Sequence, residues 1–452
     1  MTSPDVIVIG GGFAGLSAAS ALAARGARVL VADARPQLGG RATAFRDRHT
    51  GELVDNGQHV LFGCYRETLA FLKLVHAEDR VRAQDSLELV CYDRVRRRSV
   101  LRCPPLPAPL HLLAGVLKWQ PIPLKDRLNA LRLGRPIQAA RRQLQTSQTV
   151  SVDPPGLTVQ QWLDRHRQGA TLQEWLWHPL AVAALNQQPG DAAADAFVRI
   201  LSDMFAPDPS AAAVVLPLCP LHEMYAEPAR DFIVARGGEV RTSALTRVNV
   251  SSGRVAGVEL RGERLTAGAV IAAVPWFGLR GLFGASRPRE LQPVLDAAAG
   301  MAAMPIVTVN LWYDRPVMQE VFAGLPGRTM QWVFDKRIAF GESASHLSLV
   351  SSGASEIVAM TNEELSALAA QEVEASLPLA RGQWPIRSTV VREKQATFSL
   401  APGQPQRPGT RTDVANLFLA GDWTDTGLPA TIEGAVVSGN RAAAAVVESG
   451  TR

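Results

Sequence analysis

The sequence predicts an α/β protein with a Rossmann-like domain and an inserted second domain of mixed α+β structure. Three observations support this fold class. An apolar run at Val6–Ile9 leads into a glycine-rich turn, a helix of small residues and a second apolar run, which is the order of a βαβ unit. Helical and strand-like patterns both occur through the rest of the chain. The 452 residues are 47% hydrophobic, which supplies enough apolar surface for two or three domains.

The glycine-rich turn has the spacing GxGxxG, with Gly10, Gly12 and Gly15 directly after the first strand. Gly10 permits the tight turn, Gly12 lets a pyrophosphate approach the backbone, and Gly15 lets helix and strand pack closely. The N-terminus of the helix offers free N–H groups and a positive dipole end to phosphate. The second strand ends at Asp33, which can accept hydrogen bonds from a ribose diol. The whole unit predicts a dinucleotide site.

The next part of the chain reads as a strand and a loop followed mainly by helices. Residues 52–75 predict a strand, a loop and an amphipathic helix from about Tyr65. Residues 87–102 predict a hairpin whose arginine cluster is a solvated turn. Residues 158–205 predict three helices, which suit a substrate-binding domain inserted into the first domain.

Residues 103–134 are rich in proline and leucine and end in a group of lysines and arginines. Apolar residues with flanking cations and a tryptophan fit an amphipathic segment at a membrane surface. They fit a core helix of the substrate domain equally well, so both interpretations stay open. The apolar cluster consists of Leu110, Leu112, Leu113, Val116, Leu117 and Trp119.

The second half of the chain predicts a helix, several strands and a closing strand–helix pair. The helix covers 221–237, and strands follow at 239–250 and 265–274. Alternating residues then predict a mixed sheet with one helix, from strands at 304–313, 322–334, 347–350 and 386–394 and a helix at 362–376. The chain ends with a strand at 416–420 and an alanine-rich helix.

Charge and cysteine content exclude several classes of protein. The net charge of +5 comes with no interleaved aromatic and basic motif, so we expect no nucleic-acid partner. The cysteines form no CxxC pair and no metal spacing with histidine, so we expect reduced thiols and no metal site. The first strand begins at once, and no run of 18 apolar residues follows, so we expect neither a signal peptide nor a membrane span. These features predict a cytoplasmic protein, with a peripheral position on the inner face of the membrane as an option.

Two distant segments resemble the flavin amine oxidase and phytoene desaturase superfamily. RPQLGGR at 35–41 resembles the RxxxGGR extension that passes beside the cofactor pyrophosphate there. GDWTDTGLPATIEGA at 421–435 resembles the stretch that ends a strand, crosses the flavin and starts a helix. In that superfamily the aspartate bonds toward the ribityl and pyrophosphate part of FAD, and the helix N-terminus points at the pyrimidine end of the ring. The resemblance therefore implies FAD as the cofactor.

The same resemblance implies a discontinuous, GR2-type FAD-binding domain. It would consist of residues 1–90, 215–280 and 395–452, with a substrate domain of residues 91–214 and 281–394 and a candidate membrane-facing segment at 103–135. Val248 fits the apolar residue after the strand against the adenine moiety, and Glu433 fits a place beside the flavin or as a helix cap. The residues assigned to FAD are Gly10, Gly12, Phe13, Ala14, Gly15, Asp33, Ala34, Arg35, Gly39, Gly40, Arg41, Gly57, Gln58, His59, Val248, Gly421, Asp422, Thr431, Ile432, Glu433 and Ala435.

A narrower resemblance covers nearly the whole chain. DNGQHVLFGCY at 55–65 and TDTGLPATIEGA at 424–435 are similar to segments of the bacterial hydroxysqualene dehydroxylases, flavoenzymes of hopanoid biosynthesis. That family implies reductive removal of the allylic hydroxyl of hydroxysqualene to give squalene, with hydride from N5 of the reduced flavin. The substrate would be an apolar C30 isoprenoid bound in a long apolar tunnel. No second GxGxxG follows a strand, so the flavin would take its electrons from an unidentified donor.

The departing hydroxyl needs a proton or a hydrogen-bond donor near the flavin. The loop at 55–65 offers His59, Tyr65 and Asp55 as candidates. The alternative for His59 is a hydrogen bond to a loop carbonyl, and the alternative for Tyr65 is ordinary packing.

Three other functions share parts of this pattern. A carotenoid (phytoene-type) desaturase or isomerase shares the implied fold, cofactor and lipid substrate. A flavin amine oxidase would place an aromatic pair around its amine, and Trp423 is the one candidate member visible in the sequence. A prenyl carrier of the GDP-dissociation-inhibitor type needs no flavin, and the intact GD and TIEGA segments argue against it.

Overall fold

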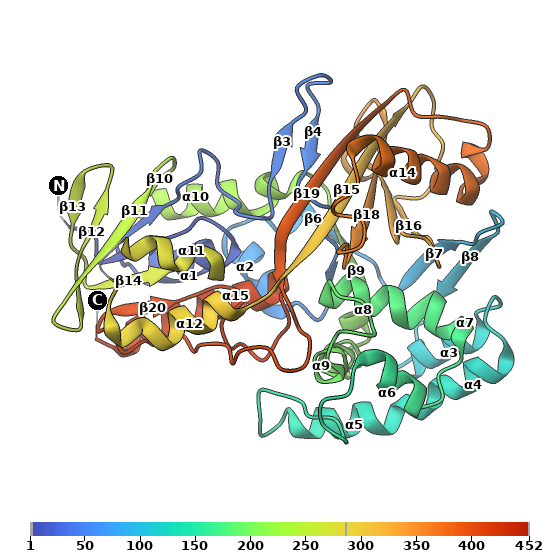
Figure 1. The fold of residues 1–452 in the computed structure, drawn as a ribbon, viewed down its shortest axis with the longest axis horizontal. Coiled ribbons are helices and arrows are strands. Elements are labelled where there is room, and N and C mark those ends of the chain that lie inside the picture. Colours follow the sequence, from blue (N-terminus) through green and yellow to red (C-terminus); the bar gives the residue numbers. More distant parts are fainter. Residues whose placement is uncertain (1–2, 285–286, 451–452) are drawn as a thin grey trace.

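The computed structural model describes residues 3–284 and 287–450 (Figure 1). A domain built on a parallel sheet holds both ends of the described chain. A second, antiparallel-rich sheet and a lobe of helices lie beside it. The predicted α/β fold with an added mixed α+β domain is confirmed.

The parallel sheet has five strands in the order β10-β2-β1-β14-β20. Their bounds are β10 Glu239–Arg241, β2 Val29–Ala32, β1 Val6–Ile9, β14 Ala269–Ala272 and β20 Leu417–Leu419. The sheet therefore gathers strands from across more than 400 residues of the chain. All neighbours pair in parallel, so their carboxyl ends meet at one edge.

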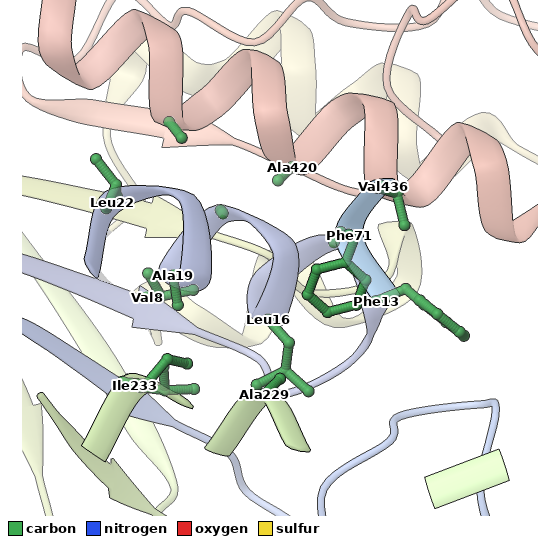
Figure 2. Packing of buried hydrophobic residues seen from close by; sticks show 14 of the residues in the cluster. Val8, Phe13, Leu16, Ala19, Leu22, Phe71, Ala229, Ile233, Ala420 and Val436 are labelled. Atoms are coloured by element: carbon green, nitrogen blue, oxygen red, sulfur yellow. The ribbon is translucent and has the colours of Figure 1, made fainter. Parts of the chain in front are cut away.

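The sheet is covered on both faces. Successive side chains of a strand point to opposite sides, so alternate residues pack into two different cores. On β1, Val6 and Val8 join a core formed with α1, α2, α10 and α15 (Figure 2). Ile7 and Ile9 join a second core formed with β11, β12, α11 and α12. These helices and strands are α1 Phe13–Ala23, α2 Arg66–Leu74, α10 Glu227–Val234, α15 Ile432–Glu448, α11 Trp276–Leu279, α12 Gln292–Gly300, β11 Thr246–Ser251, β12 Arg254–Leu260 and, beside β12, β13 Glu263–Leu265.

The second domain contains a seven-stranded sheet in the order β19-β15-β18-β17-β16-β7-β8. Its long strand β15 pairs antiparallel with β18 on one side and with β19 on the other. The elements are β19 Arg387–Phe398, β15 Ala303–Tyr313, β18 Ser345–Ser352, β17 Trp332–Asp335, β16 Phe322–Gly324, β7 Glu88–Tyr92 and β8 Arg98–Arg102, with α13 Lys336–Phe340 after β17 and α14 Asn362–Ser376 packed on the sheet.

Helices α3 to α9 form a lobe at one end of the second domain (Figure 1). Its core contains the buried rings of Trp119, Trp162 and Phe197. The first of its helices predicted from 158 onward begins with a capping box of Thr158 and Gln161. The lobe consists of α3 Leu110–Lys118, α4 Leu124–Ala130, α5 Gly134–Gln143, α6 Val159–Arg165, α7 Ala170–Leu172, α8 His178–Leu185 and α9 Ala194–Met204. Short strands complete the fold: β3 Ala44–Arg46 with β4 Leu53–Asp55, and β5 Leu61–Phe62, β9 Val214–Pro217 and β6 Val81–Ala83.

Some local predictions need correction. The helix predicted for 221–237 begins as a π-helical turn, His222–Ala226, and continues as α10. The last of the three helices predicted in 158–205 is α9, whose N-cap is Ala193. Helix α12 lies in a range assigned to the substrate domain, yet it packs in the core behind the parallel sheet. In the described ranges the four cysteines are unpaired, and no helix is long and apolar enough to cross a membrane.

Helices α1 and α15 lie in close contact through small residues. A Cβ atom placed on Gly439 would lie 2.2 Å from both the Ala14 carbonyl oxygen and the Ser17 Oγ. Ser17 in turn donates a hydrogen bond to the Ala14 carbonyl. This close approach joins the first and last helices of the chain and fixes where their N-termini lie.

We expect Gly439→Ala to lower the free energy of unfolding by about 1–3 kcal/mol, because the added methyl group overfills a packed interface. Chemical denaturation measures this change. Gly134→Ala is the matched control, since Gly134 is helical and has no atom within 4 Å of an added Cβ. That variant should be neutral or slightly more stable. Equal effects of the two substitutions would contradict the close packing of α1 on α15.

Candidate active site

A cavity of about 520 Å³ opens at the carboxyl ends of the parallel strands. This edge of an open α/β sheet is where such folds bind nucleotide ligands. The structure brings most of the predicted cofactor residues together in its wall: Gly10, Gly12, Phe13, Ala14, Asp33, Ala34, Arg35, Gly39, Gly40, Arg41, Gly57, Gln58, His59, Gly421, Asp422, Thr431, Ile432 and Ala435. Gly15, Val248, Glu433 and the catalytic candidate Asp55 lie outside it.

The first turn of α1 forms an anion cradle at this cavity. Gly12 is the N-cap and provides no side-chain hydrogen bond to the first helical N–H groups. The backbone of Gly40 approaches closely, because a Cβ on Gly40 would lie 3.3 Å from the Gly12 Cα. Gly15 contributes from behind, since a Cβ there would lie 1.9 Å from the Gly10 carbonyl oxygen. Free N–H groups beside bare backbone fit a pyrophosphate.

Asp33 is buried at the end of β2 and holds the turn together. Its carboxylate accepts hydrogen bonds from the N–H groups of Gly11, at 2.6 Å, and Arg35, at 2.7 Å. Each carboxylate oxygen can accept a further hydrogen bond. The same carboxylate can thus orient the glycine-rich turn and accept hydrogen bonds from a ribose in the cavity.

Arg41 joins the GGR segment to the C-terminal segment across the cavity. Its guanidinium donates to the Asp422 carboxylate at 2.6 Å and to the Ala396 carbonyl oxygen. The Asp422 side chain is buried and that of Arg41 is 26% exposed, so the pair is partly shielded from water. Two motifs that are 381 residues apart in the sequence therefore form one wall of the site.

The N-terminus of α15 faces the same cavity through Thr431 and Ile432. The Thr431 hydroxyl caps this helix by accepting a hydrogen bond from the Gly434 N–H. Glu433 was assigned to FAD, but the structure places its side chain elsewhere. Its carboxylate turns away from the cavity and accepts hydrogen bonds from the N–H groups of Glu67 and Thr68. It therefore caps the start of α2 and ties that helix to α15.

Val248 was also assigned to the cofactor and lies elsewhere. Its side chain is 2% exposed and belongs to the core formed by β11 and β12. Ala244, Leu245 and Thr246 line the cavity instead, at the entry to β11. The Leu245 side chain is 71% exposed, which is unusual for leucine. Only its position in the fold identifies it as a residue of the cavity wall.

The far end of the cavity is walled by the second domain. Ala183 and Ala184 come from α8, Ile306 from β15 and Val350 from β18, and they meet Val60 of the loop after β4. The sequence did not single out any of these residues, because short aliphatic side chains are equally frequent in ordinary cores. These side chains form an apolar patch in the cavity wall, beside the polar side chains of Asn186, Ser352 and Thr397.

His59 lines the cavity. Its ring forms a hydrogen bond to a loop carbonyl, which was the alternative expected for this residue. Nδ1 lies 2.8 Å from the carbonyl oxygen of Gly57, which can only accept a hydrogen bond. Nδ1 therefore carries a proton, and in the neutral ring Nε2 has a lone pair. Burial lowers the pKa of His59 below its ordinary value. The Nε2 atom of a neutral His59 therefore accepts a hydrogen bond and has none to donate.

Tyr65 lies at the N-cap of α2 and also lines the cavity. Its ring packs edge-on against Phe62, and the Thr431 side chain interacts with its hydroxyl. Burial raises the pKa of Tyr65 far above its ordinary value, so the hydroxyl stays protonated. Tyr65 is thus a permanent hydrogen-bond donor at the cavity wall.

Asp55 is not available as an acid, because it is buried in an ion pair. Its carboxylate accepts hydrogen bonds from the Lys336 ammonium and from the Gln58 side chain. Lys336 is fully buried, and its ammonium lies 3.7 Å from the centre of the Phe340 ring. The pair connects the second domain to the loop that carries Gln58 and His59. Sequence reasoning missed Lys336, which directly follows β17 at the start of α13.

Two further side-chain arrangements lie outside the cavity. Trp423 is fully buried in the core, and its indole N–H donates to the Val274 carbonyl oxygen. It therefore does not form half of an aromatic cage at the cavity.

Glu52, Glu342 and His346 bring possible ligand atoms within 4.8 Å of one another. Hydrogen bonds from Trp312 and His346 already engage these carboxylates, and the absence of a bound metal stays a prediction.

Comparison with known families identifies the class of protein. The chain belongs to the flavin-containing amine oxidoreductase family, whose match extends over residues 13–447. It is therefore a flavin-dependent oxidoreductase, and the flavin that the family implies is FAD. The predicted superfamily is confirmed.

Individual relatives are more specific. The chain is 30% identical to hydroxysqualene dehydroxylase of Rhodopseudomonas palustris, over 99% of each chain. It is 28% identical to the enzyme of that name in Zymomonas mobilis, over 96% of this chain and 97% of the other. It is 25% identical to 15-cis-phytoene desaturase of Synechococcus elongatus, over 98% and 95%.

Solved structures show the same fold at lower identity. Cyclohexylamine oxidase from Brevibacterium oxydans is 17% identical, with a TM-score of 0.71 over 100% of both chains. An oxidoreductase from Methanosarcina mazei is 17% identical, with a TM-score of 0.73 over 98% of this chain and 99% of the other.

We expect Lys336→Met to lower the free energy of unfolding by about 3–5 kcal/mol, because it leaves the Asp55 carboxylate buried without its cation. The double variant Lys336→Met/Asp55→Asn should recover part of the loss. Arg411→Met is the control, since Arg411 and Glu448 form an exposed pair whose loss should cost less than about 1 kcal/mol. Urea denaturation separates these outcomes, and a Lys336→Met effect as small as that of the control would rule out a buried pair.

Proposed function

We propose that this chain is an FAD-dependent reductive dehydroxylase that converts hydroxysqualene to squalene. The observation that carries the proposal is the apolar patch in the wall of the same cavity, formed by Val60, Ala183, Ala184, Ile306 and Val350. A C30 hydrocarbon with one hydroxyl group has few polar groups, so such a wall supplies its binding free energy. The full-length similarity to hydroxysqualene dehydroxylases supports the same substrate class.

The cavity wall fits FAD in this proposal. The amides at the start of α1 and the bare backbone of Gly40 would hold the pyrophosphate, and Asp33 would accept from the ribose. The N-terminus of α15 would face the flavin ring with its positive dipole end. When bound and reduced, FAD supplies a hydride.

The overall reaction balances as an alcohol plus a hydride and a proton, giving a hydrocarbon and water. The C–O bond breaks with its electron pair on oxygen, and allylic delocalisation stabilises the carbon left behind. The chain must therefore stabilise the departing oxygen at a site that excludes water. An external reductant, not identified by the structure, supplies the two electrons.

Tyr65 is the group we assign to the departing oxygen. Its hydroxyl stays protonated at the cavity wall and can donate a hydrogen bond to developing negative charge. His59 does not fit this role, because its neutral ring already uses the Nδ1 proton on Gly57. Its Nε2 lone pair suits positioning of the substrate hydroxyl, as an acceptor.

A phytoene-type desaturase is the second candidate, because the chain also resembles 15-cis-phytoene desaturase along its length. A flavin amine oxidase is less well supported. In the described part of the cavity wall, phenylalanine, tyrosine and tryptophan rings come only from Phe13, Tyr65 and Phe277. Phe13 stacks on Tyr225 at 3.5 Å between ring centres, which leaves it unsuited to a cage around an amine.

The proposed reaction can be tested in a single turnover without oxygen. The purified holoenzyme is reduced with dithionite, the excess is removed, and hydroxysqualene is added. We expect the flavin absorbance to return as squalene appears in equal amount. Desaturation of phytoene by the oxidised enzyme, with no squalene formed from the reduced one, would overturn the proposal in favour of the desaturase.

The role of Tyr65 predicts a contrast between two variants in the same assay. Tyr65→Phe should slow flavin reoxidation by about 10²-fold or more, whereas His59→Gln should slow it by less than about tenfold at pH 7.5. A histidine acid acts only when protonated, so its contribution would be lost as pH rises through its lowered pKa. A wild-type rate that falls as pH rises from 5 to 7, with this fall absent in His59→Gln, would reassign the donor to His59.

A further inference from the structure

Exposed leucines lie along α4 and the 3₁₀ turn Leu131–Leu133 that joins it to α5. Leu124, Leu128 and Leu131 occupy positions i, i+4 and i+7, and they are 64%, 50% and 45% exposed. Leu110 and Leu106, at and before the start of α3, are also exposed. We call these five residues the leucine row. They are five of the fourteen large apolar side chains that are exposed in the described chain, which concentrates that exposure on one edge of the helical lobe.

The leucine row shares only Leu110 with the apolar cluster singled out in the sequence. Trp119, Leu112 and Val116 of that cluster are buried, and the Trp119 indole N–H donates to Ser99. The opposite side of the α4–α5 run packs into the lobe through Ala130, Leu133, Ile137 and Ala140. Because this side is fixed in a core, the leucine row is held outward.

Positive charge gathers around the leucine row. Residues 103–152 contain seven lysines and arginines and one acidic residue, whereas the other 402 residues contain 40 basic and 41 acidic residues. The whole excess of positive charge therefore lies in this segment. Its exposed cations form no ion pair within the described ranges: Lys118, Lys125, Arg132, Arg135 and Arg142.

The three remaining charges of this segment, Asp126, Arg127 and Arg141, face the protein, and the Arg141 guanidinium donates to the Phe205 carbonyl oxygen. The Asp126 carboxylate lies against Gly169, where an added Cβ would be 2.0 Å from its oxygen. The Arg127 guanidinium donates to the carbonyl oxygens of Leu117, Gln120 and Ile122 and so fixes the connection between α3 and α4. The outward surface thus combines leucines with cations and carries no exposed acid.

We propose that this surface binds the face of an anionic phospholipid bilayer, with the α4–α5 run lying parallel to the membrane plane. Leucines in line on one side of a helix and unpaired cations beside them match the acyl–headgroup boundary of such a bilayer. A protein partner would need matching acidic groups and a fixed shape, whereas a bilayer needs only this mixture of charge and apolar side chains. The proposal does not depend on which isoprenoid the site converts.

Flotation of the full-length holoenzyme with vesicles tests the proposal. We expect binding to vesicles of equal phosphatidylglycerol and phosphatidylcholine, much weaker binding to phosphatidylcholine alone, and release by 0.5 M salt. Lys125→Glu/Arg132→Glu/Arg135→Glu should weaken binding by about 100-fold or more, at about fivefold per lost cation. Leu124→Ser/Leu128→Ser/Leu131→Ser should weaken it by about tenfold or more.

A matched control uses a second exposed apolar group on another part of the molecule. Trp384→Ser/Ile386→Ser removes side chains that are 58% and 73% exposed and should leave binding unchanged. Flavin absorbance and the melting temperature report whether each variant is folded. Binding lost equally in this control, or a wild-type protein that floats with neither vesicle, would overturn the proposal. A leucine-row variant that instead converts a dimer to a monomer in light scattering would assign the row to a second copy of the chain.

Vesicle binding and catalysis can fail independently. Turnover of detergent-dispersed hydroxysqualene needs the cavity and not the leucine row, so an active enzyme that does not float refutes only the membrane surface. A protein that floats but forms no squalene refutes only the proposed reaction.

Discussion

The close packing of α1 against α15 is the contact on which the site depends. The first helix begins at the anion cradle and the last helix begins at the opposite part of the same cavity. Gly439 lets the two helices approach until backbone touches backbone. Since a helix terminus is useful to a ligand only when it points at that ligand, the separation of these two helices sets the dimensions of the cavity. The Arg41–Asp422 pair then joins the loop that follows β2 to the loop that follows β20.

A second constraint comes from the loop that follows β4 and lies against the second domain. Its residues Gln58, His59 and Val60 line the cavity, but the loop itself has little regular structure. The ion pair of Asp55 with Lys336 anchors it to the second sheet, and Gln58 donates to the same carboxylate. A buried pair of this kind specifies position more than it adds stability, because desolvation offsets most of its attraction. The chemistry at the cavity thus depends on a lysine that does not reach it.

Local sequence patterns predicted the parts of the site that depend on backbone conformation. The glycines at fixed spacing and the threonine at the start of α15 act within a few residues of their own position, and the acid at the end of β2 acts on Gly11 within the same βαβ unit. Val248 and Glu433 show the limit of such patterns. Val248 lies two residues beyond Thr246, the last lining residue of this segment, so it falls in the core and not in the cavity wall. Glu433 has the right neighbours for a flavin contact, but α2 offers its carboxylate two free N–H groups from the other side.

The sequence by itself determined the fold class, the family and the implied cofactor of this protein. These follow from short segments whose conformation is set by sterics and by hydrogen bonding within the segment. Only the tertiary structure decided which candidate side chains face the cavity, that Asp55 is neutralised by Lys336, and which leucines remain outside the core. Those outcomes depend on contacts between residues hundreds of positions apart. Such contacts decide how deeply a group is buried, and burial changes whether an ionisable group is charged and whether an apolar group is covered. The spacing of residues in the sequence predicts neither property.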